Sequence, residues 1–320
     1  MTNVKICVIL HLCRTLHMTE GHISHLFKER YGFQSMFGRR ADGKVIKGLS
    51  GFFKVIPYIM PTRVDATNYS EMDLDCRPIS QYVREKGAEG INISFMSVLI
   101  AAYVRSIAEK PDINRFVVNK RIYARNHIAV CFVVLKADGN QTGEETVVKI
   151  ICDPKDTVFD IAEKVNRAID DNRKAGSNNA TDKLVNLLFR IPFLAGFLVG
   201  CLKLLDRYGL LPRAVINASP FHTSMFITNM ASIKMNSIYH HCYNFGTTGV
   251  FISMGTKVKK ESIRHDGGRV VRQIMPLKIA TDERICSGAA YAHHFYNFQK
   301  YLANPAVLET PPETVNKDLK

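Results

Sequence analysis

Residues 275–301, MPLKIATDERICSGAAYAHHFYNFQKY, decide the fold. The stretch opens with apolar side chains at alternating positions, Leu277 and Ile279, which is the period of a half-buried strand. A turn of charged and small residues follows over 281–288. From residue 289 onward the apolar and aromatic residues recur three or four positions apart, which predicts a helix. A strand that enters a helix through such a turn is typical of α/β proteins, and the turn is a candidate for reactive side chains.

The rest of the chain also mixes helix and strand patterns. The clearest amphipathic helix covers residues 93–108 and is stopped by Pro111, and a second one covers residues 157–171. Strand patterns occur at 63–69, 116–118, 121–123, 127–135, 145–152, 225–231 and 247–255, and a basic hairpin at 257–272. We therefore expect an α/β domain.

The composition limits the classes of partner. The chain has 320 residues, 46% of them hydrophobic, which is enough for one large domain or two small ones. Its net charge of +14 suits an anionic partner, such as nucleic acid, a membrane surface or a phosphorylated ligand like coenzyme A. The basic residues are spread out and form no nucleic-acid-binding signature, so we expect no nucleic acid partner.

The cysteines and histidines indicate a reduced protein without a metal. None of the eight cysteines forms a Cys-x-x-Cys pair, and Cys131 and Cys152 lie inside apolar strand patterns. This predicts buried free thiols in a cytoplasmic protein rather than a disulfide framework or a zinc site. The vicinal pair His240 and His241 lacks further ligands at metal-site spacing, so no metal is expected.

The turn itself carries a family signature. It resembles the C-terminal segment of chloramphenicol acetyltransferases and of dihydrolipoyl acyltransferase catalytic domains, whose motif is His-x-x-x-Asp-Gly within Asp-His-Arg-x-x-Asp-Gly. Four residues stand in the register of that motif: Asp282, Arg284, Gly288 and Ala289. Two positions depart from it, because Glu283 replaces the catalytic histidine and Ser287 replaces the aspartate. The resemblance supports the fold more strongly than the activity.

Other segments extend the resemblance over about residues 39–304. Residues 110–114, KPDIN, match a Pro-x-Leu-Asn element that ends a helix in the family. Residues 225–231, MFITNMA, resemble the strand Phe-Thr-Ile-Ser-Asn-Leu-Gly, with Thr228 at the serine and Asn229 at the asparagine. The chain is similar to bacterial proteins labelled as 2-oxoacid dehydrogenase acyltransferase family members, several of which share the Thr-Asp-Glu-Arg-Ile-Cys element.

The resemblance implies a two-layer sandwich in which a mixed sheet is packed with helices. It also implies acyl transfer between coenzyme A and a thiol or hydroxyl of a small molecule, in a homotrimer whose sites lie between subunits. Glu283 then stands at the position of the general base and Thr228 at that of the oxyanion donor. The positioning residues by the same alignment are Asn229, Asp282, Arg284, Ser287 and Gly288.

The substituted motif leaves alternatives open. A glutamate has an ordinary pKa about 2 units below that of histidine, which weakens it as a base unless burial raises the value. His240 or His241 is a substitute base if either enters the same cleft. A catalytically inactive binding or scaffold protein with the same fold is the alternative to an enzyme.

The domain organisation follows the limits of the resemblance. We expect an N-terminal extension over 1–35, either a real helical appendage or an over-long start before Met36. The acyltransferase-like domain covers 36–304, with an apolar helical insertion at 184–212, and a C-terminal tail covers 305–320. The extension is too short for a lipoyl domain, which favours a free-standing relative over a core subunit of a dehydrogenase complex.

The apolar stretch 184–205 is too interrupted to span a membrane. Arg190, Pro192 and Lys203 leave a charge-free run shorter than the roughly 18–20 residues that a span needs. A helical hairpin is expected here. Because basic residues flank it, a peripheral contact with a membrane surface is the second hypothesis for this stretch.

Overall fold

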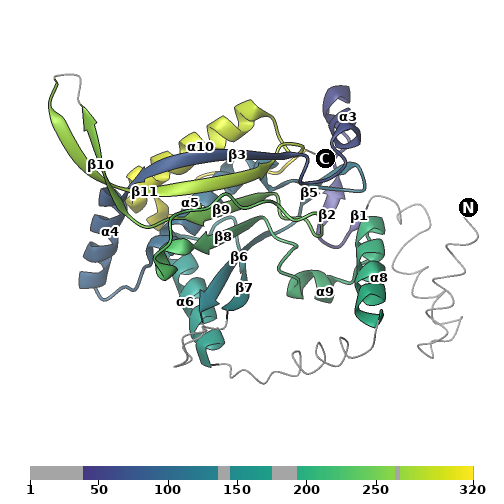
Figure 1. The fold of residues 1–320 in the computed structure, drawn as a ribbon, viewed down its shortest axis with the longest axis horizontal. Coiled ribbons are helices and arrows are strands. Elements are labelled where there is room, and N and C mark those ends of the chain that lie inside the picture. Colours follow the sequence, from purple (N-terminus) through teal and green to yellow (C-terminus); the bar gives the residue numbers. More distant parts are fainter. Residues whose placement is uncertain (1–38, 136–144, 175–192, 264–266, 320) are drawn as a thin grey trace, which may run out of the picture.

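The structure is a computed structural model that describes residues 39–135, 145–174, 193–263 and 267–319 (Figure 1). The predicted extension 1–35 and the first part of the apolar stretch, residues 184–192, lie outside the described residues.

A mixed seven-stranded sheet forms the centre of the described fold. Its order is β10–β11–β9–β8–β6–β7, and β3 pairs with β11 along the edge opposite β9. β8 runs parallel to β6 and β9, whereas the other pairs are antiparallel. The strands are β3 (Thr67–Asp75), β6 (Ile128–Leu135), β7 (Glu145–Cys152), β8 (Met225–Asn229), β9 (Val250–Met254), β10 (Val258–Ile263) and β11 (Arg269–Asp282).

A small second sheet and the helices complete the fold. The four-stranded sheet has the order β1 (Arg39–Arg40), β2 (Gly43–Val45), β5 (Arg121–Arg125), β4 (Phe116–Val118). The helices are α3 (Gly51–Ile59), α4 (Cys76–Ala88), α5 (Phe95–Glu109), α6 (Val158–Lys174), α8 (Leu194–Tyr208), α9 (Arg213–Ala218) and α10 (Gly288–Ala303). Short 3₁₀ turns are η1 (Pro111–Asn114), η2 (Met230–Ile233) and η3 (Pro305–Glu309).

The core lies between the main sheet and one layer of helices. Along β6, Val130 and Phe132 belong to the large cluster shared with α4, α5, α6 and α10, whereas Cys131 belongs to a small cluster on the other face. This alternation follows from the two-residue period of a strand, and each fully buried large side chain stabilises the fold by about 1.5–3 kcal/mol. The predicted fold class, an α/β sandwich of a mixed sheet packed with helices, is confirmed.

β11 and α10 form the strand–turn–helix unit that the sequence predicts. β11 ends at Asp282, and α10 begins at Gly288 after a turn. Ser287 is the N-cap of α10, because its Oγ accepts a hydrogen bond from the backbone N–H of Ala290 at 3.2 Å. Since β11 pairs with β3, β9 and β10, the turn after it is held by the best-connected strand of the sheet.

Some predicted strand limits are wrong. The segment 63–69 becomes a strand only at Thr67, because Arg63 is drawn into contacts with the end of β11 instead of a strand ladder. The segment 247–255 is extended only from Val250, because the N–H groups of Thr247 and Thr248 both donate to the carbonyl of Phe221. Local sequence patterns give no sign of either long-range contact.

The C-terminal segment 305–319 is fixed to the body. η3 buries Leu308, and Arg115 donates two hydrogen bonds to the carboxylate of Asp318. The N–H of Asn316 also donates to the carbonyl of Ala108 at 2.8 Å. The segment therefore lies across the end of α5.

Candidate active site

The turn after β11 is supported by a buried carboxylate with two guanidinium partners. Asp282 is fully buried and accepts hydrogen bonds from Arg284 Nε and Nη2, both at 2.8 Å, and from Arg63 Nε at 3.2 Å. We call these three side chains the Asp282 cluster. Because one carboxylate faces two guanidinium groups, the cluster retains an excess positive charge next to the turn.

The two arginines also tie three other segments to the end of β11. Arg63 donates from Nη1 to the carbonyl of Tyr243 at 2.5 Å and from Nη2 to that of Val117 at 3.1 Å. Arg284 donates from Nη1 to the carbonyl of Met60 at 3.1 Å. Burial lowers the pKa of Arg63, although the charge of Asp282 opposes the shift. The cluster is thus a structural anchor for the walls of the turn.

Glu283 lies between Asp282 and Arg284 of the Asp282 cluster. Its backbone N–H donates to the carbonyl of Ala66 at 2.9 Å, and its side chain is half-buried. The carboxylate has no hydrogen bond or ion pair with any described residue, and the neighbouring Arg284 turns to Asp282 instead. Among the described residues, Glu283 is therefore held through its backbone and not through its carboxylate.

Two of the predicted positioning residues have local roles in the turn. Ser287 caps α10, as described above, and is exposed. Gly288 starts that helix with open space where a Cβ would lie, so no close approach requires a glycine there. By contrast, Asp282 and Arg284 do contact each other, as residues that shape the turn should.

Thr228 and Asn229 lie far from the turn within one chain. Thr228 pairs with Ser253 of β9, which in turn pairs with Lys278 of β11. Strand geometry then separates Thr228 from Glu283 by about 17 Å along the strands and about 10 Å across them. The hydroxyl of Thr228 is 3.6 Å from the sulfur of Met230, and the buried Oδ1 of Asn229 has no partner in the described chain.

His240 and His241 lie on the face of the sheet away from the helices. The His240 ring stacks on Phe251 with centroids 3.9 Å apart, and the His241 ring stacks on His240 at 5.1 Å. Nδ1 of His240 is 2.9 Å from the carbonyl of His241. This carbonyl can only accept, so Nδ1 donates, and a neutral ring keeps Nε2 as the proton acceptor.

A second buried ionic cluster lies at the same end of the main sheet as the Asp282 cluster. The sequence patterns do not predict it. Arg40 donates to both oxygens of Asp42, at 2.8 and 3.1 Å, and to Asp206 Oδ1 at 2.6 Å. His222 Nε2 lies 3.2 Å from the same Asp206 oxygen. Burial opposes ionisation of both aspartates, but their hydrogen bonds and the charge of Arg40 prevail and lower the pKa of each. We call this group the Arg40 cluster.

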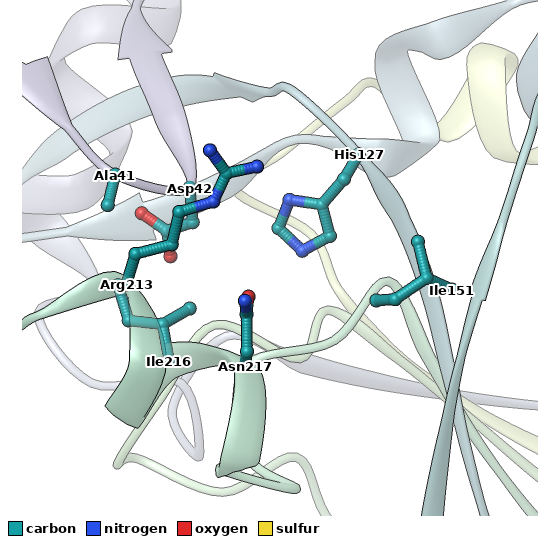
Figure 2. A pocket seen from close by; sticks show the side chains of 7 residues that line it. All are labelled: Ala41, Asp42, His127, Ile151, Arg213, Ile216 and Asn217. Atoms are coloured by element: carbon teal, nitrogen blue, oxygen red, sulfur yellow. The ribbon is translucent and has the colours of Figure 1, made fainter.

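A cavity of about 100 Å³ lies beside the Arg40 cluster. Figure 2 shows Asp42, His127, Arg213 and Asn217 around it. His127 Nδ1 is 2.9 Å from Asn126 Oδ1, whereas its Nε2 is buried without a partner in the described chain. Burial, aided by the charges of Arg125 and Lys149, lowers the pKa of His127 to about 3, so the imidazole is neutral at physiological pH. The residues that line the cavity are too far apart in the sequence to form a motif.

Comparisons with known proteins agree with this architecture. The sequence model of the 2-oxoacid dehydrogenases acyltransferase catalytic domain matches residues 245–309, which run from the segment before β9 through the candidate turn to η3. A search of curated proteins finds no match.

Three solved structures share the fold at low sequence identity. A probable dihydrolipoamide acetyltransferase from Listeria monocytogenes is 15% identical, with 79% of this chain and 92% of that chain aligned at a TM-score of 0.51. The cubic core of a pyruvate dehydrogenase multienzyme complex is 12% identical over 81% and 88%, at 0.53. The dihydrolipoamide acetyltransferase of Azotobacter vinelandii is 12% identical over the same shares, at 0.52.

These findings identify the fold of the chain. It has the fold of dihydrolipoamide acetyltransferase catalytic domains. The segment that carries the turn matches the 2-oxoacid dehydrogenase acyltransferase family, so the resemblance predicted from the sequence is confirmed.

The Asp282 cluster gives a first testable prediction. Asp282→Asn leaves two buried guanidinium groups without a carboxylate, which should cost about 3–5 kcal/mol of unfolding free energy. Urea denaturation of the variant measures this loss. The matched control is Glu163→Gln, which removes an exposed ion pair with Arg167 and should cost less than about 1 kcal/mol. Equal losses in the two variants would show that the cluster does not anchor the turn.

The Arg40 cluster predicts a dependence of stability on pH. Because the folded pKa of Asp206 lies below its unfolded value, its ionisation stabilises the fold above about pH 4, and this contribution disappears as the pH falls through the folded pKa. Asp206→Asn should therefore lower the melting temperature strongly at pH 7 and by a smaller amount at pH 3. The exposed Asp65→Asn is the control. A difference that stays constant between the two pH values contradicts the assignment.

Proposed function

We propose that the protein is an acyltransferase that moves an acyl group between coenzyme A and a thiol or hydroxyl of a small molecule. The observation that carries the proposal is the turn after β11, where the family match coincides with a half-buried Glu283 carboxylate, next to the Asp282 cluster, that has no partner among the described residues. A cytoplasmic location is part of the proposal. The free thiols of the six described cysteines support a reducing compartment.

The chemistry assigns one role to each reactive group. Glu283 takes the proton from the acceptor thiol or hydroxyl, and the freed sulfur or oxygen attacks the thioester carbonyl. The carbonyl oxygen becomes an oxyanion, to which the hydroxyl of Thr228 donates a hydrogen bond. The intermediate then expels the thiolate of coenzyme A, which takes up the proton that Glu283 received from the acceptor.

This mechanism requires a site shared between subunits. Thr228 and Glu283 lie roughly 20 Å apart within one chain by strand geometry, which is too far for one substrate carbonyl to contact both. A symmetric homotrimer that places Thr228 of one subunit against Glu283 of the next removes the conflict. The unpaired Oδ1 of Asn229 beside Thr228 is further support, since a buried acceptor is normally paired in the assembled protein.

A binding protein without catalytic activity is the second candidate. It is favoured by Ser287, which replaces the aspartate of the family motif and serves here as the cap of α10. In that case the turn would still be held by the Asp282 cluster, but no proton transfer would take place at Glu283.

Assembly provides one test of the proposal. Light scattering at micromolar concentration should give a mass about three times that of the chain. Co-expression of Thr228→Val and Glu283→Gln subunits should restore activity, because about a quarter of the sites in randomly mixed trimers carry both native residues. A monomer, or mixed assemblies as inactive as their parents, would exclude the shared site.

Catalysis provides the second test. Glu283→Gln preserves shape but cannot accept a proton, so thiol release from acetyl-coenzyme A should fall by about 10²–10⁴. Thr228→Val should lower it by about 10²–10³. Binding of coenzyme A should change little in either variant, and the exposed Glu313→Gln serves as control.

Two outcomes separate the alternatives. Wild-type protein that releases no thiol above the buffer rate supports the binding protein. If wild type is active and Glu283→Gln is equally active, Glu283 is not the base and the role passes to His240 or His241. The variants His240→Gln and His241→Gln then test these two residues. The double change Glu283→His with Ser287→Asp restores the family motif and should raise activity if the proposed site is correct.

A further inference from the structure

α3 has an apolar surface that the described structure leaves uncovered. Phe53 and Ile56 are partly buried and Pro57 is buried, whereas Phe52 and Ile59 are 75% and 70% exposed. Phe52 and Ile59 are two helical turns apart and lie on one side of the helix together with Val55. A surface helix normally carries polar residues on its outer side. The outer side of α3 is instead apolar, and packing within the described fold does not cover it.

α8 has the same character over a greater length. Phe197 and Leu204 are 59% and 52% exposed, and Phe193 directly before the helix is 92% exposed. Among the α8 side chains that the structure describes, that of Asp206 is buried, in the ion pair with Arg40. The helix is thus fixed to the body by an ion pair, while Phe197 and Leu204 are exposed.

The turn between β4 and β5 joins the two helices into one surface. Lys120 in this turn places its ammonium 4.9 Å above the ring of Tyr58 in α3. Arg207 of α8 donates to the side chain of Asn119 in the same turn at 3.3 Å. Figure 1 shows α3 and α8 on the same side of the molecule, far from the β10–β11 hairpin. We call α3, this turn and α8 the α3–α8 face.

The charges of this face are of one sign. In the segments 39–60, 116–125 and 193–218 the acidic residues are Asp42 and Asp206, and both are buried in the Arg40 cluster. The exposed charged side chains on the face are basic: Lys54, Lys120, Lys203 and Arg207. Apolar side chains flanked by unopposed cations match the interface of an anionic lipid bilayer, where rings and aliphatic chains enter the acyl boundary and cations remain at the headgroups.

We propose that the α3–α8 face docks the protein on the surface of membranes that contain anionic lipids. This inference goes beyond acyl transfer and is independent of whether Glu283 is catalytic. A second copy of the chain suits the face less well, since contact through it would bring like charges together. The proposed docking is peripheral, and no helix in the described part of the chain is long and apolar enough to cross a bilayer.

Vesicle flotation with the full-length protein tests the proposal. The protein should float with vesicles of phosphatidylcholine and phosphatidylglycerol, and much less with phosphatidylcholine alone or in high salt. Lys54→Glu combined with Lys203→Glu should weaken the partition coefficient at least about 25-fold, because each basic residue near an anionic surface contributes about fivefold. Phe197→Ser combined with Leu204→Ser should also reduce binding, without loss of melting temperature, since both side chains are exposed.

Matched controls lie on the opposite side of the molecule. Val271→Ser combined with Ile263→Ser removes exposed apolar side chains of the β10–β11 hairpin, and Lys259→Glu changes an exposed charge there. These variants should float like wild type. Wild type that fails to float, or face variants that float as well as the controls, would overturn the proposal. Loss of self-association in the Phe197→Ser, Leu204→Ser variant, without wild-type flotation, would assign the face to a second copy instead.

Discussion

The fully buried carboxylate of Asp282 is the constraint on which the candidate site depends. It sits at the last residue of the strand with the most pairing partners and accepts hydrogen bonds from Arg63 and Arg284. A buried charge is tolerated only when it is paired and hydrogen-bonded, so both arginines must fold against it. Their remaining N–H groups then fix the carbonyls of Met60, Val117 and Tyr243 around the turn. One ionised group thereby sets the position of four segments.

The sequence predicts the elements that local periodicity encodes. Alternation at Leu277 and Ile279 and helical spacing after residue 289 correctly predict β11 and α10, and most other elements follow the same rules. Periodicity carries no information about partners distant in the chain. Arg63 and Asp282 are 219 positions apart, and Arg40 and Asp206 are 166 apart, so neither cluster could be predicted. The predicted limits of the strands near Arg63 and Thr247 are wrong for the same reason.

The candidate site, too, can be predicted from the sequence only in part. Motif resemblance selects Glu283 and Thr228 by their positions in two separate segments, but only the strand register gives their separation. Because of that separation, the proposed chemistry requires the trimer that the resemblance implies. His127 and its cavity belong to no motif, because their neighbours come from the β1–β2 turn, from β7 and from α9. Pairing across the fold determines this cavity, and a pattern within any single segment cannot reveal it.

The Arg40 cluster connects the internal electrostatics to the outer surface. Asp206 is the acidic residue of α8, and its burial against Arg40 holds the helix to the body with little apolar packing. Phe197 and Leu204 of α8 therefore remain exposed, and in our proposal they contact the lipid bilayer. The same ion pair removes the negative charge of Asp206 from the exposed side, where Lys203 and Arg207 remain. A neutral residue at 206 would release the helix, whereas an exposed aspartate there would oppose an anionic bilayer. Burial of this one carboxylate satisfies both requirements, which links the anchoring of α8 to the charge of the α3–α8 face.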